Sequence, residues 1–150
     1  MLYSYKFRDT APITPVAVID YCGPVDLSIR SFYTMNDKNY EMYVCALMSR
    51  MCGHEITMEN LDDTKPYLNE ISPINYTETA VPTVIAHGMK DNIVPYENAL
   101  ALEKALSERD IRHDLVAFPN SGHGLDEDPA ASDTVYRLFY QYAKDYLGIR

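Results

Sequence analysis

The sequence predicts an α/β protein: part of a doubly wound, mainly parallel sheet flanked by helices. Three short apolar segments have the composition of buried strands, and helical patterns follow or separate them. Strands that alternate with helices favour parallel pairing, because the chain must cross a face of the sheet between them. Right-handed crossovers then bring the carboxyl ends of all three strands to one edge, where ligands of such sheets bind.

The three strands are predicted from their apolar runs. Pro15–Tyr21 is nearly continuous in apolar residues, as in a parallel strand with both faces covered, and it stops at the loop signal Cys22–Pro24. Val81–Ala86 is the second strand, with Pro82 near its start, where a missing N–H is tolerated. Asp114–Phe118 is the third.

Two helices follow the second and third strands. The first begins at Pro95, whose ring fits a first helical turn. Its apolar stripe consists of Ala99, Leu102 and Leu106. The second helix is predicted over residues 134–147, and Gly148 is a suitable C-terminal stop. Its stripe consists of Val135, Leu138, Phe139, Tyr142 and Tyr146.

Residues 31–70 are less regular. Tyr40–Met51 has a helical pattern, and Met58–Leu68 predicts a short helix with turns. An excursion of this kind between two strands forms either a cap over a pocket or a packed surface segment, and both interpretations stay open. The length of the chain suits one domain over residues 1–150.

The charge balance excludes some classes of partner. The chain has 22 acidic and 13 basic residues, a net charge of −9, so neither a nucleic acid nor an anionic lipid surface is expected to bind. No apolar run approaches the length of a membrane span, and Met1–Arg8 does not resemble a signal peptide.

The cysteines suggest neither a disulfide framework nor a metal site. Cys22, Cys45 and Cys52 are odd in number and irregular in spacing, which favours reduced thiols in a cytoplasmic protein. Adding His54 to the last two does not produce a known zinc pattern. No metal or organic cofactor is expected.

Two polar residues follow the second and third strands. Asp91 lies in His-Gly-Met-Lys-Asp-Asn-Ile-Val-Pro, and His123 lies in Ser-Gly-His-Gly. We interpret them as an acid that orients an imidazole and as the imidazole base itself, which titrates near neutrality. The alternatives are a turn aspartate and a solvated loop histidine. His87 follows the second strand directly, and a packing role is expected for it.

A nucleophile is missing from this pattern. No Gly-x-Ser-x-Gly occurs in the 150 residues, so the sequence contains no nucleophile elbow. Cys22, at the end of the first strand, is an alternative nucleophile that would pair with His123. Ser121 is close to His123 in sequence, but it lies in no strand–turn–helix motif.

Four segments in order resemble the C-terminal half of an α/β-hydrolase, most closely the esterase, lipase and prolyl-oligopeptidase-like group. They are Asp20–Leu27, Ser72–Tyr76, Pro82–Pro95 and Phe118–Gly124. The resemblance implies a partial α/β-hydrolase fold. It also implies hydrolysis of a small-molecule carboxylic ester, or of a peptide, with His123 as base and Asp91 as its orienting acid.

The chain departs from that family in its first half. Family members carry an oxyanion-hole loop and a nucleophile elbow before these segments, whereas Met1–Tyr5 resembles the end of the helix that follows the elbow. By this resemblance the serine is expected about two helical turns before Met1. The 150 residues are therefore expected to be a fragment that is inactive alone.

Two other functions are considered. The chain is a non-catalytic remnant or interaction module if its exposed sheet edge or face pairs with a second copy, so a homo-oligomer is expected. A Rossmann-like cofactor binder is less consistent with the sequence, because no glycine-rich phosphate loop follows any strand.

Overall fold

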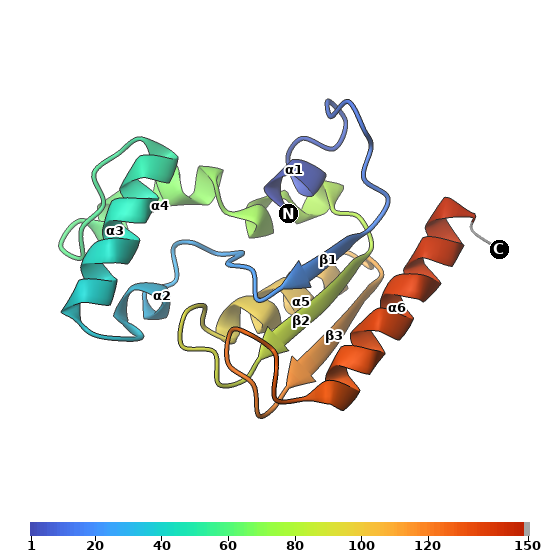
Figure 1. Cartoon of the computed structure of the whole chain (residues 1–150). Helices are drawn as coiled ribbons and strands as arrows, with labels where there is room; N and C mark the ends of the chain where they lie inside the picture. The colour runs from blue at the N-terminus through green and yellow to red at the C-terminus, as the bar shows by residue number, and fades with distance from the viewer. Residues whose placement is uncertain (149–150) are drawn as a thin grey trace.

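The structure is a computed structural model that describes residues 1–148, with a three-stranded parallel sheet at its centre (Figure 1). The strands are β1 (Val18–Tyr21), β2 (Thr83–Gly88) and β3 (His113–Phe118), in that order across the sheet. Thr83 is the register partner of both Val18 and His113. The three carboxyl ends therefore meet at one edge, and the predicted fold class is confirmed.

Helices cover both faces of the sheet. The other elements are α1 (Leu2–Tyr5), α2 (Ser31–Thr34), α3 (Lys38–Cys52), α4 (Leu61–Glu70), the 3-10 helix η1 (Pro73–Thr79), α5 (Glu97–Ser107) and α6 (Pro129–Leu147). One face packs against α5, α1 and η1, with Ile85 and Leu102 in its core. The opposite face packs against α6, with Val84, Phe118 and Val135. Within residues 1–148, no helix has the length and apolar character that a membrane crossing requires.

Helices α2, α3 and α4 form an excursion, residues 31–70, that lies beside the sheet and not on it (Figure 1). The excursion has its own apolar core, which includes Phe32, Val44 and Leu68. Asp37 begins α3 by accepting hydrogen bonds from the backbone N–H groups of Asn39 and Tyr40. Whether the excursion acts as a cap over a pocket or as a packed surface segment stays a prediction.

The element boundaries differ from the sequence patterns in two informative places. The run Pro15–Tyr21 contributes only four residues to β1, because backbone pairing with β2 begins at Val18. β1 is an edge strand in the described part of the chain, and Tyr21 is 51% exposed, so the expected burial on both faces is wrong there. Helix α6 begins at Pro129, five residues before the predicted start, since proline suits a first helical turn.

Gly88 lets the loop after β3, residues 119–128, approach the end of β2. We call this loop, which contains His123, the histidine loop. The backbone N–H of Met89 donates to Phe118 O, and that of Lys90 donates to Ser121 O at 3.1 Å. A Cβ atom on Gly88 would lie 2.3 Å from Gly122 O and 2.6 Å from Ser121 O. Backbone atoms at such distances cannot rotate away, so a side chain here would displace the loop.

Strand β1 carries a buried carboxyl group on the face that α5 covers. Asp20 is 8% exposed, and its Oδ2 atom has no hydrogen-bond partner among the described residues. Burial raises the pKa of Asp20 to about 6, although the charge of His87 and a backbone hydrogen bond from Gly23 lower it in part. The carboxyl group of Asp20 is therefore protonated at higher pH in the folded state than in the unfolded state.

Replacing Gly88 by alanine should damage stability and the histidine loop together. We expect Gly88→Ala to lower the free energy of unfolding by about 1–3 kcal/mol, because the new methyl group overpacks against backbone. Urea denaturation followed by circular dichroism measures this loss. Gly122→Ala is the matched control, because its Cβ would meet only Lys90 O at 3.7 Å. Equal stability of both variants would contradict the proposed contact.

Replacing Asp20 by asparagine should change how stability depends on pH. Since the folded pKa is raised to about 6, the stability that Asp20 contributes is full below about pH 4 and is lost as pH rises toward 6. Asp20→Asn removes this loss, so the variant should gain about 2 kcal/mol relative to the parent between these pH values. Asp63→Asn, at an exposed carboxylate, is the control. Parallel stability curves for parent and Asp20→Asn would refute the assignment.

Candidate active site

Asp91 lies in a tight turn after β2, residues 91–94, which we call the acid turn. The turn fixes the Asp91 carboxylate. The Oδ1 atom accepts hydrogen bonds from the backbone N–H groups of Ile93 at 2.8 Å and Val94 at 2.9 Å. The carboxylate is buried, with the residue 6% exposed. Because Oδ1 is held by two donors, Oδ2 is left to face the loop that follows β3.

His123 lies in that loop and meets Asp91. Its Nδ1 atom is 2.9 Å from Asp91 Oδ2. An ionised carboxylate only accepts hydrogen bonds, so Nδ1 carries the proton and Nε2 of the neutral ring has a free lone pair. The imidazole side chain is 40% exposed, whereas the carboxylate behind it is fully covered. The structure thus brings together the two residues that the sequence singled out, in the geometry of an acid that orients a base.

The carboxylate of Asp91 stays ionised despite its burial. Burial alone would raise its pKa, but hydrogen bonds from His87, the N–H groups of Val94 and Ile93, and His123 together lower the pKa well below the usual range. A permanent negative charge at Oδ2 stabilises the imidazolium that forms whenever His123 takes up a proton.

The histidine loop is held by an aspartate that the sequence patterns did not single out. Asp128 Oδ2 accepts hydrogen bonds from the N–H groups of Asn120 and Ser121 and from the Ser121 hydroxyl. Ser121 Oγ in turn accepts from the N–H of Glu127 at 3.0 Å. Ser121 is fully buried and its hydroxyl is engaged on both sides, so it serves the loop and is not available as a nucleophile.

His87 packs against the acid turn. The ring is fully buried, and its Nε2 atom lies 3.0 Å from Val94 O and 3.4 Å from Asp91 Oδ2. Tyr96 packs against the ring edge to face, with centroids 5.7 Å apart. These contacts agree with a packing role, because the buried ring contacts both the turn and Tyr96.

Cys22 is unsuited to act as a nucleophile. The thiol group is buried, and burial raises its pKa to about 12, with the neighbouring Asp91 charge adding to the effect. A protonated thiol is a poor nucleophile and a poor metal ligand. Among residues 1–148, the side chains close enough to share a metal ion are Cys22, His87 and Asp91. An ion there would have to displace the hydrogen bonds that both oxygens of Asp91 already accept.

A cavity of about 330 Å³ opens beside His123 at the carboxyl edge of the sheet. Its lining is mostly aromatic and aliphatic, and His123 contributes its one imidazole. The lining residues are Tyr21, Cys22, Gly23, Pro24, Phe32, Tyr40, Tyr43, Val44, Leu47, Ile93, Val94 and His123. Helices α2 and α3 therefore supply one wall, and the loop after β1 supplies another. The cavity suits an uncharged apolar group placed next to the imidazole.

The aromatic wall was not predicted from the sequence. Tyr40 and Tyr43 stood in a segment with a clear helical pattern, but a pattern gives the helix and not the surface that it faces. Their aromatic character was the available signal, and it was too common among the thirteen tyrosines to distinguish a pocket wall from surface.

Comparisons with solved structures agree on the fold. The chain superimposes on Pyrococcus horikoshii acylaminoacyl peptidase with a TM-score of 0.66 at 17% identity, covering 89% of this chain and 20% of that one. A Mycobacterium tuberculosis puromycin-hydrolyzing peptidase gives 0.63 at 20% identity, with 85% and 18% covered. A truncated carbohydrate esterase from gut microbiota gives 0.61 at 24% identity, with 87% and 44% covered. The chain thus spans less than half the length of each.

Sequence comparisons give the family. An AB hydrolase superfamily protein of Bacillus subtilis, YisY, is 46% identical over 44 residues, which are 29% of this chain and 15% of that protein. The model of the prolyl oligopeptidase family matches residues 31–150, which include the excursion, the acid turn and the histidine loop. On that match the chain belongs to the prolyl oligopeptidase family of α/β-hydrolases.

Proposed function

We propose that this chain carries the acid and the base of a serine hydrolase that acts on carboxylic esters. The observation that supports the proposal is the hydrogen bond between His123 Nδ1 and the buried Asp91 carboxylate, in a residue that also lines the apolar cavity. This arrangement orients one imidazole nitrogen toward a reacting group and stabilises the ring when it becomes charged.

The reaction needs a serine from a segment outside the 150 residues. Nε2 of His123 takes the serine proton as the hydroxyl oxygen attacks the acyl carbon, and the same nitrogen then protonates the leaving alkoxide. An acyl-enzyme remains. His123 next removes a proton from water as the water oxygen attacks the acyl carbon. The bond from the acyl carbon to the serine oxygen then breaks, Nε2 returns the proton to that oxygen, and the carboxylic acid and the free serine result. Asp91 remains ionised throughout and holds the ring in place.

The choice of ester over peptide rests on the similar proteins and on the cavity. The solved relatives include both a carbohydrate esterase and peptidases, so hydrolysis of a peptide is the second candidate for the same site. The described cavity is mostly apolar, and its lining contains no Asp, Glu, Lys or Arg to pair with a charged peptide terminus, which favours a small uncharged acyl or alcohol group. No cofactor takes part in the proposed chemistry. The three free thiols agree with the predicted cytoplasmic location.

Asp91→Asn should reverse the tautomer of His123. The amide oxygen of the new side chain keeps the two backbone donors, so its NH₂ group must occupy the position of Oδ2 and face Nδ1. We expect long-range ¹H–¹⁵N spectra at about pH 8.5 to show the proton on Nδ1 in the parent and on Nε2 in the variant. Asp126→Asn, an exposed carboxylate in the same loop, should leave the tautomer unchanged. A proton on Nε2 in the parent would refute the acid–base pair.

The missing nucleophile is tested on the same samples. Treatment with a fluorophosphonate probe and peptide mapping should find no residue whose labelling depends on His123. Hydrolysis of a p-nitrophenyl ester should not exceed that of His123→Ala. A serine or cysteine that is labelled in the parent and spared in His123→Ala would mean that the chain builds a nucleophile site by itself.

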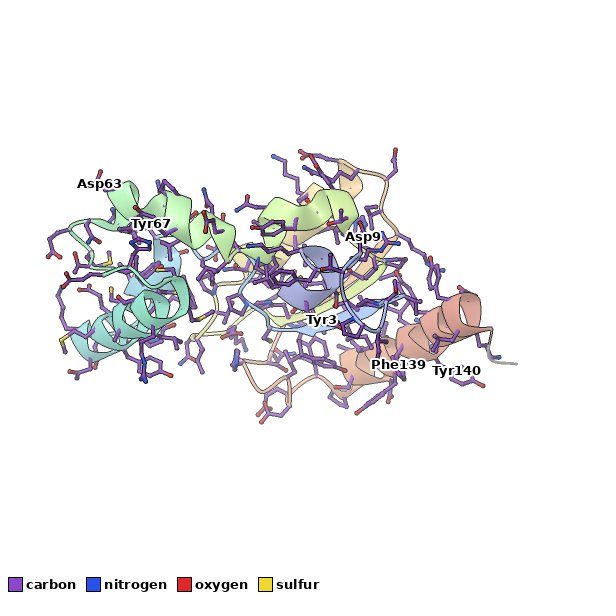
Figure 2. The ribbon with its side chains drawn as sticks, turned by 90° about the horizontal axis from the view of Figure 1, so that it is seen from above. Tyr3, Asp9, Asp63, Tyr67, Phe139 and Tyr140 are labelled. Carbon is purple, nitrogen blue, oxygen red and sulfur yellow. The ribbon has the colours of Figure 1, made fainter. Side chains whose placement is uncertain are left out.

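A candidate function of a different class, self-association without catalysis, is favoured by the exposed edge of the sheet at β1. Next to the outer edge of β1 lies an apolar groove of about 310 Å³. The lining residues are Val16, Ala17, Val18, Ile19, Phe139, Tyr142, Ala143 and Leu147. Figure 2 shows Phe139 and Tyr140 projecting from α6, and both are more than half exposed. An unpaired strand edge beside exposed aromatic side chains favours pairing with a second copy.

Self-association predicts a particle of at least twice the chain mass of 17.1 kDa. We expect size-exclusion chromatography with light scattering to show this dimer or a larger oligomer. Phe139→Asp should shift the protein toward monomer, because a carboxylate in the groove opposes its burial. Met42→Asp, on the exposed face of α3, is the matched control. A monomeric parent at all concentrations would eliminate this candidate.

A further inference from the structure

Two consecutive peptide units of the acid turn are held at both of their ends. The N–H of each unit donates to Asp91, as described above, and the C=O of each unit accepts a hydrogen bond from a side chain of the excursion. The excursion therefore reaches the Asp91 carboxylate through the backbone, without contacting it directly.

The first unit joins Asn92 to Ile93. Its carbonyl oxygen, on Asn92, accepts a hydrogen bond from Asn36 Nδ2. Its N–H, on Ile93, donates to Asp91 Oδ1 at 2.8 Å. Asn36 lies between α2 and α3 and is exposed. The hydrogen bond is the contact that the structure assigns to its side chain.

The second unit joins Ile93 to Val94. Its carbonyl oxygen, on Ile93, accepts a hydrogen bond from Tyr40 Oη. Its N–H, on Val94, donates to the same Asp91 oxygen at 2.9 Å. Burial raises the pKa of Tyr40 and the nearby Asp91 charge adds to it, so the hydroxyl keeps its proton and stays a donor.

A hydrogen bond to the carbonyl of a peptide unit strengthens its N–H as a donor, because the two groups share one polarisable amide. Asn36 and Tyr40 thus reinforce the two N–H groups that hold Asp91. They also restrain the plane of each unit, which sets the direction of the N–H bond. Val94 is 3% exposed and packs in the core of the excursion with Phe32 and Val44, so the turn is anchored there by packing as well.

We propose that Asn36 and Tyr40 are positioning residues that align the Asp91 carboxylate with His123 through the peptide units 92–93 and 93–94. The catalytic meaning of this alignment rests on the proposed function, whereas the coupling itself does not. The excursion would then do more than line the cavity, because its docking on the acid turn would determine whether the acid faces its histidine.

The test uses the amide signals of the turn in the intact 150-residue chain. Each side chain serves one peptide unit, so each substitution has its own target. Asn36→Ala should move the Ile93 amide proton upfield and speed its exchange with solvent. Tyr40→Phe, which keeps the ring, should do the same to the Val94 amide. Loss of one such hydrogen bond corresponds to about 3- to 10-fold faster exchange.

The effect on His123 provides the second reading. We expect the Nδ1 proton of His123, which is hydrogen-bonded to Asp91, to exchange faster in both variants and fastest in the double variant. If a residue only helped α3 to fold, its substitution would change the chemical shifts and exchange rates of many amides. The specific match of each substitution to one amide would then be absent. Asn39→Ala on α3 and Tyr67→Phe on α4, at exposed positions of the excursion outside the cavity, are the matched controls and should leave Ile93, Val94 and His123 unchanged.

Each outcome decides the proposal. Responses confined to the matching amide, together with faster exchange at His123, support it. Unchanged amides in folded variants overturn it, and so do equal responses in the two controls. If Tyr40→Phe fails to fold, Asn36→Ala still decides, since its side chain is exposed. A failed tautomer experiment with intact amide coupling would refute the proposed function and leave the coupling in place.

Discussion

The hydrogen-bonded turn around the Asp91 carboxylate is the constraint on which the rest of the site depends. One buried carboxylate is held by four groups, the two backbone N–H groups of its own turn, His87 and His123, and its turn packs on the excursion. A buried carboxylate is tolerated when donors of this number surround it, and they keep it ionised. The same bonds that offset the cost of burial therefore prepare the charge that the imidazole needs.

This turn is also where two of the three apolar cores of the described chain meet. Val94 belongs to the core of the excursion, whereas Ala99, on the helix that follows, belongs to the core under the sheet. A short segment that is packed into both cores cannot move relative to either without a loss of packing. The cavity beside His123 is lined by Phe32 and Val44 of the excursion core and by Cys22 of the core that α6 covers. Ligand sites are common where two such packed units meet.

The open edge of β1 contrasts with the closed site. At the carboxyl edge the polar groups of the turn and the histidine loop are largely satisfied, through Asp91 and Asp128. Along β1 the apolar groove and the exposed ring of Phe139 are left uncovered in the described residues. The chain spans less than half of each solved relative described above, and self-association, the other candidate function, concerns this uncovered surface.

The sequence by itself determined the parallel α/β arrangement and the proximity of Asp91 and His123, since strand composition and right-handed crossovers are local or topological rules. It also identified the family, because four spaced motifs do not depend on packing. Tertiary structure alone decided the protonated state of Cys22, the engagement of Ser121 by Asp128 and the link from Tyr40 to the acid turn. The burial of Cys22 and the contact from Tyr40 involve residues distant in sequence, and Ser121 and Asp128 meet only through the conformation of their loop. No local pattern encodes which surfaces meet.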